Sequence, residues 1–255
     1  MKIATWNINS LRVRLPHVLQ WLAIHQPDVL ALQETKTEDR NFPVAEFAAA
    51  GYAVAFSGQP TYNGVALLSR QPMQVFANSI PGFPDPQKRV LGATAGDVAI
   101  LNLYVPNGQS IDSDKYRYKL EWLSKLAAWI EALQQEHPRL ILLGDFNIAP
   151  EDRDVYDPRA WQGQVLVSEP EREAFRRLLA LGLNDSFRLH EAAGGHYSWW
   201  DYRAGGFRLN QGLRIDHILL SQPLAERSLA AFIDREPRGW ERPSDHTPVI
   251  AELDF

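Results

Sequence analysis

Five short segments place polar side chains directly after apolar, strand-like runs of the chain. They read TWNIN (5–9), LQETK (32–36), YVPNG (104–108), GDFN (144–147), and the pair RID (214–216) with SDH (244–246). Burying such groups without hydrogen-bond partners costs free energy. In α/β sheets, ligand sites gather at the ends of strands. We therefore expect these groups to pair with one another or to surround a ligand.

Each segment has a simpler interpretation when it is taken alone. Asn7 and Asn9 suit turns after a strand, and Tyr104 suits half-buried packing in a strand. Asp145 after a glycine could belong to a turn, and His246 could be an ordinary loop histidine. All of these interpretations would have to hold at five strand ends in one chain, so the combination favours a shared site.

The residue types suit hydrolysis of a phosphodiester. Such a reaction needs a water aimed in line, a base, and cations where negative charge gathers. The segments supply carboxylates, amides and a histidine, and the chain contains no cysteine. A metal would have to be held by oxygen or imidazole ligands, which favours Mg²⁺ or Mn²⁺ over zinc. No serine–histidine–aspartate spacing is visible, so a covalent serine mechanism is the poorer interpretation.

The net charge of −5 bounds the kind of nucleic-acid partner. A protein that coats nucleic acid non-specifically needs cations to neutralise phosphates, and this chain has an excess of acidic residues. An enzyme acting on nucleic acid remains compatible, because acidic residues can surround a metal while basic ones line the approaches. The candidate basic groups are Arg12 with Arg14, Lys88 with Arg89, Lys115 with Arg117 and Lys119, and Arg203 with Arg208 and Arg214.

The elements that must position these groups alternate between strands and helices, which indicates an α/β architecture. Strands are expected at 2–6, 27–34, 53–56, 64–69, 73–77, 89–95, 98–104, 139–143, 214–220 and 248–253. Helices are expected after an N-cap at Ser10, at 44–50, at 114–136, and from Ser168, which forms a capping box with Glu171. No linker or low-complexity stretch divides the chain, so we predict one domain, residues 1–255.

No membrane or export segment is expected. No apolar run approaches the length of a membrane span, and the first residues lack a basic region followed by an apolar stretch. We predict a cytoplasmic protein that does not bind membranes.

Together these segments resemble the exonuclease–endonuclease–phosphatase superfamily and, within it, the exodeoxyribonuclease III family of abasic-site endonucleases. The resemblance covers nearly the whole chain and is carried by TWNINSLR, LALQETK, NLYVPNG, LLGDFNIAPEDRDV, EPEREAF, GLRIDHILLS and PSDHTPV. It implies a four-layer α/β sandwich like deoxyribonuclease I, with two β-sheets face to face and helices outside. It also implies a DNA-repair hydrolase that acts as a monomer on duplex DNA with abasic sites or blocked 3′ ends. The implied reactions are cleavage 5′ to the abasic site, 3′-end trimming and 3′-to-5′ exonuclease action.

The resemblance implies a division of roles among the site residues. Glu34 is the principal Mg²⁺ ligand, with Mn²⁺ able to substitute. Asn7, Asn9 and Asp245 lie on the metal side. The phosphate and DNA contacts are implied to include Asn107, Lys36, Arg12 and Lys88.

The implied acid–base division places Asp145 as the group that orients and deprotonates the attacking water. Asn147 and Tyr104 contact the phosphate. His246 donates to the phosphate and stays cationic because Asp216 pairs with it, since a neighbouring carboxylate raises the pKa of a histidine.

The stretch SWWDYRAGGFRLNQG (198–212) could be a packed aromatic strand and loop. The resemblance instead implies that Trp199, Trp200 and Leu213 form the wall of a pocket for an extruded sugar. Many relatives carry lysine where Gly205 stands, which predicts a weaker grip on DNA here, and phenylalanine where Trp200 stands, whose bulkier ring could narrow the pocket.

Two alternatives remain open from the sequence. One is an enzyme of the same fold that acts on a non-DNA substrate, such as a phosphoinositide or sphingomyelin. The other is a catalytically silent nucleic-acid-binding module. Turnover with and without a chelator, and turnover on lipid vesicles, discriminate between them.

Overall fold

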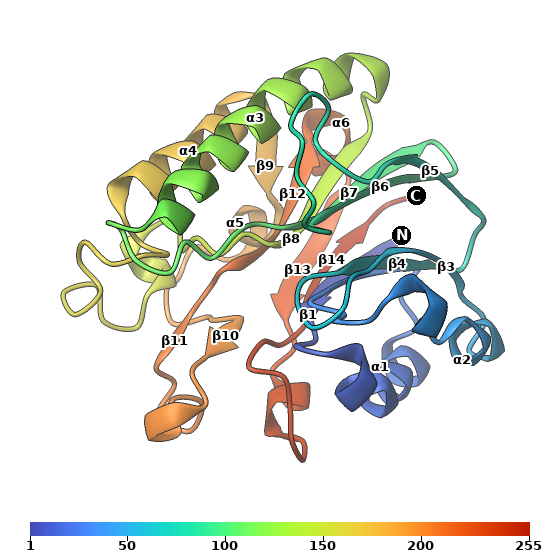
Figure 1. Ribbon diagram of the computed structural model, residues 1–255, viewed down its shortest axis with the longest axis horizontal. Coiled ribbons are helices and arrows are strands. Elements are labelled where there is room, and N and C mark those ends of the chain that lie inside the picture. Colours follow the sequence, from blue (N-terminus) through green and yellow to red (C-terminus); the bar gives the residue numbers. More distant parts are fainter.

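The computed structural model describes residues 1–255 and contains two six-stranded β-sheets that pack face to face (Figure 1). Helices α1 (Leu11–His25) and α2 (Val44–Ala49) cover the outer face of the first sheet. Helices α3 (Asp114–Glu136) and α4 (Glu169–Ala180) cover the outer face of the second. The predicted four-layer α/β sandwich is therefore confirmed.

The first sheet has the strand order β13-β14-β1-β2-β4-β3. Only β1 and β2 are parallel, and the other pairs are antiparallel. The strands are β1 (Lys2–Asn7), β2 (Val29–Gln33), β3 (Ala53–Ser57), β4 (Val65–Ser69), β13 (Ser228–Ile233) and β14 (Val249–Leu253).

The second sheet has the order β5-β6-β7-β8-β12-β9 and also contains one parallel pair, β7 with β8. Its strands are β5 (Met73–Ala77), β6 (Val90–Ala95), β7 (Val98–Tyr104), β8 (Leu140–Asp145), β9 (Leu183–Asp185) and β12 (Asp216–Ser221). Parallel neighbours end at the same edge of a sheet, so each parallel pair brings two strand ends together.

The close approach of β7 and β8 depends on a glycine. Gly144 has φ 142°, and a Cβ at this position would lie 1.9 Å from the carbonyl oxygen of Leu103. No other residue fits without moving one of the two strands. The glycine that precedes Asp145 therefore fixes where this carboxylate leaves the sheet.

Three apolar layers hold the sandwich together. Between the sheets lie mostly small and branched side chains, including Val29, Ala31 and Ile100. The outer layers are richer in aromatic residues, with Trp21 on the buried face of α1 and Trp122 on the buried face of α3. Burial of apolar area on both faces of each sheet explains why most of the central strands read as continuous apolar runs.

Most of the predicted elements are present, with ends shifted by one or two residues. The capping box of Ser168 and Glu171 forms at the start of α4. Ser10 does precede α1, but its side chain makes no capping hydrogen bond, and its φ of 93° differs from that of an ordinary N-cap. The backbone N–H of Ser10 donates instead to the carbonyl of Glu34, so this turn is fixed by the neighbouring strand end.

The sequence did not predict the short elements of the C-terminal half. These are β9, α5 (Ser186–His190), β10 (Trp199–Trp200), β11 (Gly212–Leu213), α6 (Gln222–Ala225) and β13. Most have too few residues to show a periodicity, and β13 is an edge strand with Leu229 63% exposed. No helix is long and apolar enough to cross a membrane.

Candidate active site

The site lies where the two parallel strand pairs end at the same edge of the sandwich. Asn7 ends β1 and pairs in register with Gln33, which precedes Glu34. Tyr104 ends β7 and pairs in register with Asp145 at the end of β8. The fold thus brings the polar segments of both halves together, as the strand-end argument predicted.

Glu34 lies at the centre of a set of three donors. The amide of Asn7 and the hydroxyl of Tyr104 each donate to Oε1 at 2.9 Å, and the ammonium of Lys36 contacts Oε2 at 2.8 Å. Burial raises the pKa of Glu34, but Lys36 and Asn7 outweigh burial and hold the pKa below its ordinary value. Glu34 is therefore ionised near neutral pH and able to hold a cation.

Asp145 is buried and has an unusually high proton affinity. Its Oδ2 accepts from the amide of Asn7 at 2.9 Å, and its Oδ1 accepts from the backbone N–H of Asn147 at 2.9 Å. Burial and the nearby carboxylates of Asp216 and Glu34 raise the pKa of Asp145 to about 7, although His246 opposes this. A carboxylate with this pKa can accept a proton near neutral pH.

His246 is buried between two carboxylates. Its Nδ1 lies 2.9 Å from Oδ2 of Asp216, and its Nε2 lies 3.7 Å from Oδ2 of Asp145. Burial alone would lower the pKa of His246, but Asp216 and Asp145 outweigh it and raise the pKa to about 10. The ring is an imidazolium at neutral pH and carries a proton on Nε2.

Ser198 is a member of the site that sequence reasoning missed. Its hydroxyl donates to Oδ2 of Asp216 at 2.6 Å and accepts the backbone N–H groups of Ile215 and Asp216. It therefore fixes the carboxylate that pairs with His246. Only its place at the head of the aromatic stretch 198–212 could have drawn attention to it.

Asn107 and Asn147 form a pair of amides beside this centre. The amide nitrogen of Asn107 donates to Oδ1 of Asn147 at 3.0 Å, and the amide nitrogen of Asn147 donates to the carbonyl of Val105 at 3.0 Å. Asn147 has φ 51°, a left-handed conformation that asparagine tolerates better than most residues. Asn107 is exposed, so its side chain is open to a ligand.

Asn9, Lys36 and Asp245 connect the metal-side groups. Lys36 donates to Oδ1 of Asn9 at 2.6 Å, and the amide nitrogen of Asn9 donates to Asp245 at 3.0 Å. The other oxygen of Asp245 accepts from the indole N–H of Trp199 at 3.0 Å. Burial raises the pKa of Asp245, but His246 and these donors outweigh it and lower the pKa. Both oxygens of Asp245 thus face protein donors.

The residues present fit a hard divalent cation. One oxygen of Glu34, one oxygen of Asp145 and one ring nitrogen of His246 lie within 4.8 Å of one another. Because His246 is an imidazolium, its nitrogen cannot act as a ligand, and the carboxylate oxygens are the better donors. The ammonium of Lys36 already bridges Glu34 and Asn9, which shows that these oxygens attract a cation. The amide nitrogen of Asn7 donates to both Glu34 and Asp145 and so links the two carboxylates, while its side-chain oxygen accepts the N–H of Asn9.

The three residues expected to form a pocket wall are differently exposed. Trp200 and Leu213 are fully buried, and Trp200 packs edge-on against Phe207. Leu213 lies in an apolar cluster with Leu166, whose φ of 76° is rare for a branched residue. Only Trp199, which is partly exposed, presents surface next to Asp245.

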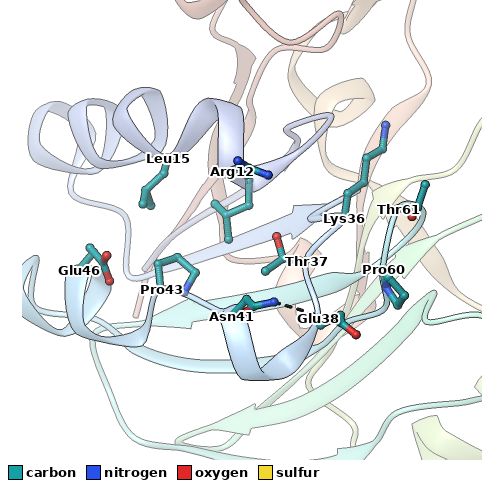
Figure 2. Close-up of a pocket in the computed structure, with 11 residues that line it drawn as sticks. Arg12, Leu15, Lys36, Thr37, Glu38, Asn41, Pro43, Glu46, Pro60 and Thr61 are labelled. Carbon is teal, nitrogen blue, oxygen red and sulfur yellow. Dashed lines mark hydrogen bonds between the residues drawn. The ribbon is translucent and has the colours of Figure 1, made fainter.

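Two hollows flank the site. The first has a volume of about 600 Å³, and Figure 2 shows Arg12 and Lys36 on the side opposite Asn41 and Glu38. Arg12 is exposed and makes no hydrogen bond or ion pair within the chain, so its guanidinium is free for a ligand.

The second hollow has a volume of about 710 Å³ and shares Tyr104 and Asn107 with the site. Its 12 lining residues include cations and no carboxylate, although the chain as a whole is acidic; they are Gln59, Tyr62, Asn63, Gln87, Arg89, Tyr104, Pro106, Asn107, Gly108, Gln109, Lys115 and Tyr118. Lys88 lies next to this hollow and is half-buried.

Comparisons with known proteins agree with this geometry. A family model described as the endonuclease/exonuclease/phosphatase family matches residues 4–246. Exodeoxyribonuclease III of Haemophilus influenzae is 39% identical over 99% of this chain and 100% of that protein. A solved 3′ phosphatase from Neisseria bound to a product DNA hairpin superposes with a TM-score of 0.98 at 47% identity, covering 100% of both chains. An AP endonuclease from Archaeoglobus fulgidus superposes with a TM-score of 0.97 at 39% identity, again covering 100% of both chains.

Proposed function

Because the chain belongs to the endonuclease/exonuclease/phosphatase family, we propose that it is a metal-dependent DNA-repair nuclease that hydrolyses phosphodiester bonds at abasic sites and at blocked 3′ ends. The observation that carries the proposal is the pairing of a buried Asp145 whose pKa is about 7 with a buried His246 whose pKa is about 10. One group can accept a proton while the other remains a cation, within 3.7 Å of each other.

Asp145 accepts the proton of the attacking water. The amide of Asn7 and the backbone N–H of Asn147 hold one carboxylate oxygen each, so the group cannot rotate away. A base acts best when its pKa lies near the working pH, and the pKa of about 7 meets this condition. General base catalysis of this kind contributes about 10²- to 10⁴-fold.

His246 donates a hydrogen bond from its Nε2–H to a phosphate oxygen. The charge of the imidazolium stabilises the negative charge that develops there. Asp216 holds the ring through Nδ1, and Ser198 holds Asp216. Donors that are fixed before the reaction begins stabilise developing charge without reorganisation. The side-chain amide of Asn107 adds a neutral donor, and the hydroxyl of Tyr104, which donates to Glu34, holds that carboxylate in place.

Glu34, with Asp145 beside it, would hold a divalent cation, which would neutralise charge on the phosphate oxygens. The cation is proposed to be Mg²⁺, with Mn²⁺ as a substitute, because the donors are hard oxygens. Lys36 bonds to Glu34 and Asn9 and balances part of the carboxylate charge around the proposed cation site.

The DNA path is proposed to cross the two hollows. Arg12 supplies an unpaired cation on one side, and Arg89 and Lys115 supply cations on the other. Lys88 adds a further cation at this rim. The absence of carboxylates from the second hollow suits a polyanion, and phosphate neutralisation there predicts a modest dependence of affinity on salt.

The test is a product analysis on three duplexes, which carry an abasic site, a 3′-phosphate or a clean nick. EDTA should abolish all cleavage, and Mg²⁺ or Mn²⁺ should restore it. Glu34→Gln should lose most turnover while still binding DNA, and Arg12→Ala should weaken binding with little effect on kcat. Full activity in EDTA, or turnover only on phosphoinositide or sphingomyelin vesicles, would overturn the proposal.

A specific observation favours 3′-end removal over abasic-site cleavage. Trp200 and Leu213 are buried, which leaves Trp199 as the open part of the expected sugar pocket. A 3′ phosphatase from Neisseria is also among the similar structures. A chain end needs only to reach the cation, whereas an abasic sugar must be extruded and held, which costs a few kcal/mol.

The Trp199→Ala variant tests this ranking. If Trp199 selects the lesion, abasic-site cleavage should fall more than 3′-phosphate removal. If both cleavage rates fall by the same factor at equal folded fraction, Trp199 does not select the lesion and serves only in packing. We also propose that residues 1–255 form a single domain, because the layer between the sheets draws on both Ile3 and Val249. We propose that this domain acts as a monomer.

A further inference from the structure

Lys119 of α3 and Glu171 of α4 form an ion pair in the interior of the protein. Both side chains are 0% exposed. Lysine is almost never fully buried unless it is paired, because removing its charge from water is costly. Burial lowers the pKa of Lys119, and the neighbouring Glu171 offsets part of this effect. The pair lies outside the catalytic residues described above.

The ammonium of Lys119 makes two further hydrogen bonds, and both go to the loops of the active site. Nζ donates to the carbonyl of Asn107 at 3.1 Å and to the carbonyl of Asn147 at 2.6 Å. With Glu171, these contacts use all three donors of the ammonium. The same two asparagines are joined through their side chains at 3.0 Å. Lys119 thus lies behind the amide pair and bonds to its backbone.

Glu171 is equally well satisfied on its side. Its carboxylate accepts the backbone N–H groups of Leu166 and Ser168, each at 3.1 Å, as well as the hydroxyl of Ser168. These contacts fix the carboxylate to the first turn of α4. The position of Lys119 is therefore set by two helices that pack on the second sheet.

Two apolar side chains could fill the same space without the cost of removing two charges from water. They could not bond to the carbonyls of two loops. Asn147 also has a φ of 51°, a conformation that persists only where the surroundings hold it. The ion pair thus has a role that apolar packing could not fill, because it binds the backbone carbonyls of both loops.

We infer that Lys119 is a positioning residue, whose ammonium holds the backbone of Asn107 and Asn147 so that their side-chain amides meet the phosphate and the N–H of Asn147 stays on Asp145. The inference rests on the proposed function, because it assigns these amides to phosphate recognition. A displacement of about 1 Å in such groups can cost about 100-fold in rate.

The experiment separates positioning from folding with three variants. Lys119→Met removes the donors, Glu171→Gln removes the counter-charge but leaves the donors, and the double variant removes both charges. Lys125→Met, an exposed lysine of the same helix, is the matched control. Melting temperature, kcat and KM on the 3′-phosphate duplex are measured for each.

Lys119→Met should lower kcat about 100-fold, while Glu171→Gln should lower the melting temperature and keep kcat within about threefold of wild type. The double variant should recover melting temperature relative to either single variant without recovering kcat. Recovery of both together, or loss of kcat in Glu171→Gln as large as in Lys119→Met, would overturn the inference.

Two further measurements test the positioning role of Lys119. Combined with Asn147→Ala, Lys119→Met should add little loss, since residues that act through one another are not additive; independent, multiplicative losses contradict the inference. The side-chain amide NMR signals of Asn107 and Asn147 should shift in Lys119→Met and not in Glu171→Gln. This readout needs no turnover, so an inactive wild type would refute the proposed function while the amide signals still decide the positioning role.

Discussion

Two buried polar clusters lie on either side of the start of β12, and they differ in charge balance. The catalytic cluster holds four carboxylates, Glu34, Asp145, Asp216 and Asp245, against the cations Lys36 and His246. The backing cluster is built around Arg214 and holds two arginines against two carboxylates.

In the backing cluster every charge has a partner at bonding distance. Arg214 contacts Asp154 at 2.7 Å and Asp185 at 2.8 Å, and Arg188 also bonds to Asp154. Burial raises the pKa of Asp154 and Asp185, but the arginines outweigh burial and lower both pKa values. In the catalytic cluster, by contrast, the pKa of Asp145 rises to about 7.

The difference indicates what each cluster is for. In a balanced cluster every charge already has a partner within the protein, so the cluster has no free capacity for a ligand. A cluster with more carboxylates than cations is less favourable without a ligand. Its excess negative charge raises the pKa of one carboxyl group toward neutral pH, so that this group can accept a proton, and it attracts a cation from outside. Burial alone would not have distinguished the two.

The largest expected effect is that of Asp145→Asn on turnover. The variant should lose about 10³-fold in kcat, since an amide cannot accept the water proton. Its melting temperature should stay equal or rise, because one of several like charges is removed. The measurements are kcat and the melting temperature. A variant that melts several degrees lower yet keeps a normal kcat would show that Asp145 serves stability rather than catalysis, and the two clusters would then not differ in role.

For Asp154→Asn we expect the opposite result, a loss of stability with little change in turnover. It leaves Arg214 and Arg188 without full compensation in the interior, which should lower the free energy of unfolding by about 3 kcal/mol. Turnover per folded molecule should stay close to wild type. Denaturant unfolding with kcat corrected for folded fraction checks this, and a kcat loss comparable to that of Asp145→Asn would place the backing cluster within the catalytic machinery.

His246→Ala should lower kcat about 100-fold, the size expected for a lost donor to developing charge. Asp216→Ala should cost less, because Asp216 acts through His246, and the double variant should be no worse than His246→Ala alone. Single-turnover rates for the three variants give the answer. Additive losses would mean that Asp216 has a role of its own.

The last prediction concerns the pH dependence of stability, through His217 of the backing cluster. Arg214 lies 3.1 Å from its Nδ1, and its Nε2 lies 2.9 Å from the carbonyl of Ile148. Burial and Arg214 lower the pKa of His217 from 6.5 to about 4. Between pH 6.5 and pH 4, His217 is protonated in the unfolded chain and neutral in the folded chain. The free energy of unfolding therefore falls as pH drops from 6.5 to 4.

The His217→Gln variant should lose this component, which has a slope of at most about 1.4 kcal/mol per pH unit. For His246, whose pKa is raised to about 10, the sign is reversed, and stability is lost as pH rises from 6.5 through 10. Urea unfolding from pH 4 to 7 measures the difference. An unchanged slope in His217→Gln would show that His217 carries a proton in the folded protein.

The sequence predicted the catalytic cluster better than the backing cluster, for a physical reason. Glu34 and Asp145 each end an apolar strand, so a local pattern marks them. Arg214 was expected inside a strand, but the structure places it before β12, in contact with Asp154 and Asp185. That cluster exists only through long-range packing, which leaves no periodic signal.

The same limit applies to the residues that hold the site. Ser198 and Lys119 bond to catalytic segments from elements that are distant in the sequence, and neither stands beside a strand end with a polar run. Only the family resemblance implied a pocket wall at Trp200. Its complete burial depends on Phe207 and Tyr197, whose positions follow from loop geometry rather than from pattern.

The pairing of β1 with β14 has a consequence for protein synthesis. Asn7 leaves the ribosome long before His246, yet both belong to one site, and β1 needs β14 as its neighbour. Such distant pairing slows folding, because the intervening chain must be closed into a loop. A nascent chain that still lacks residues 244–253 carries Glu34 and Asp145 without the imidazolium. The nascent chain therefore has no complete site until β14 has emerged and paired with β1.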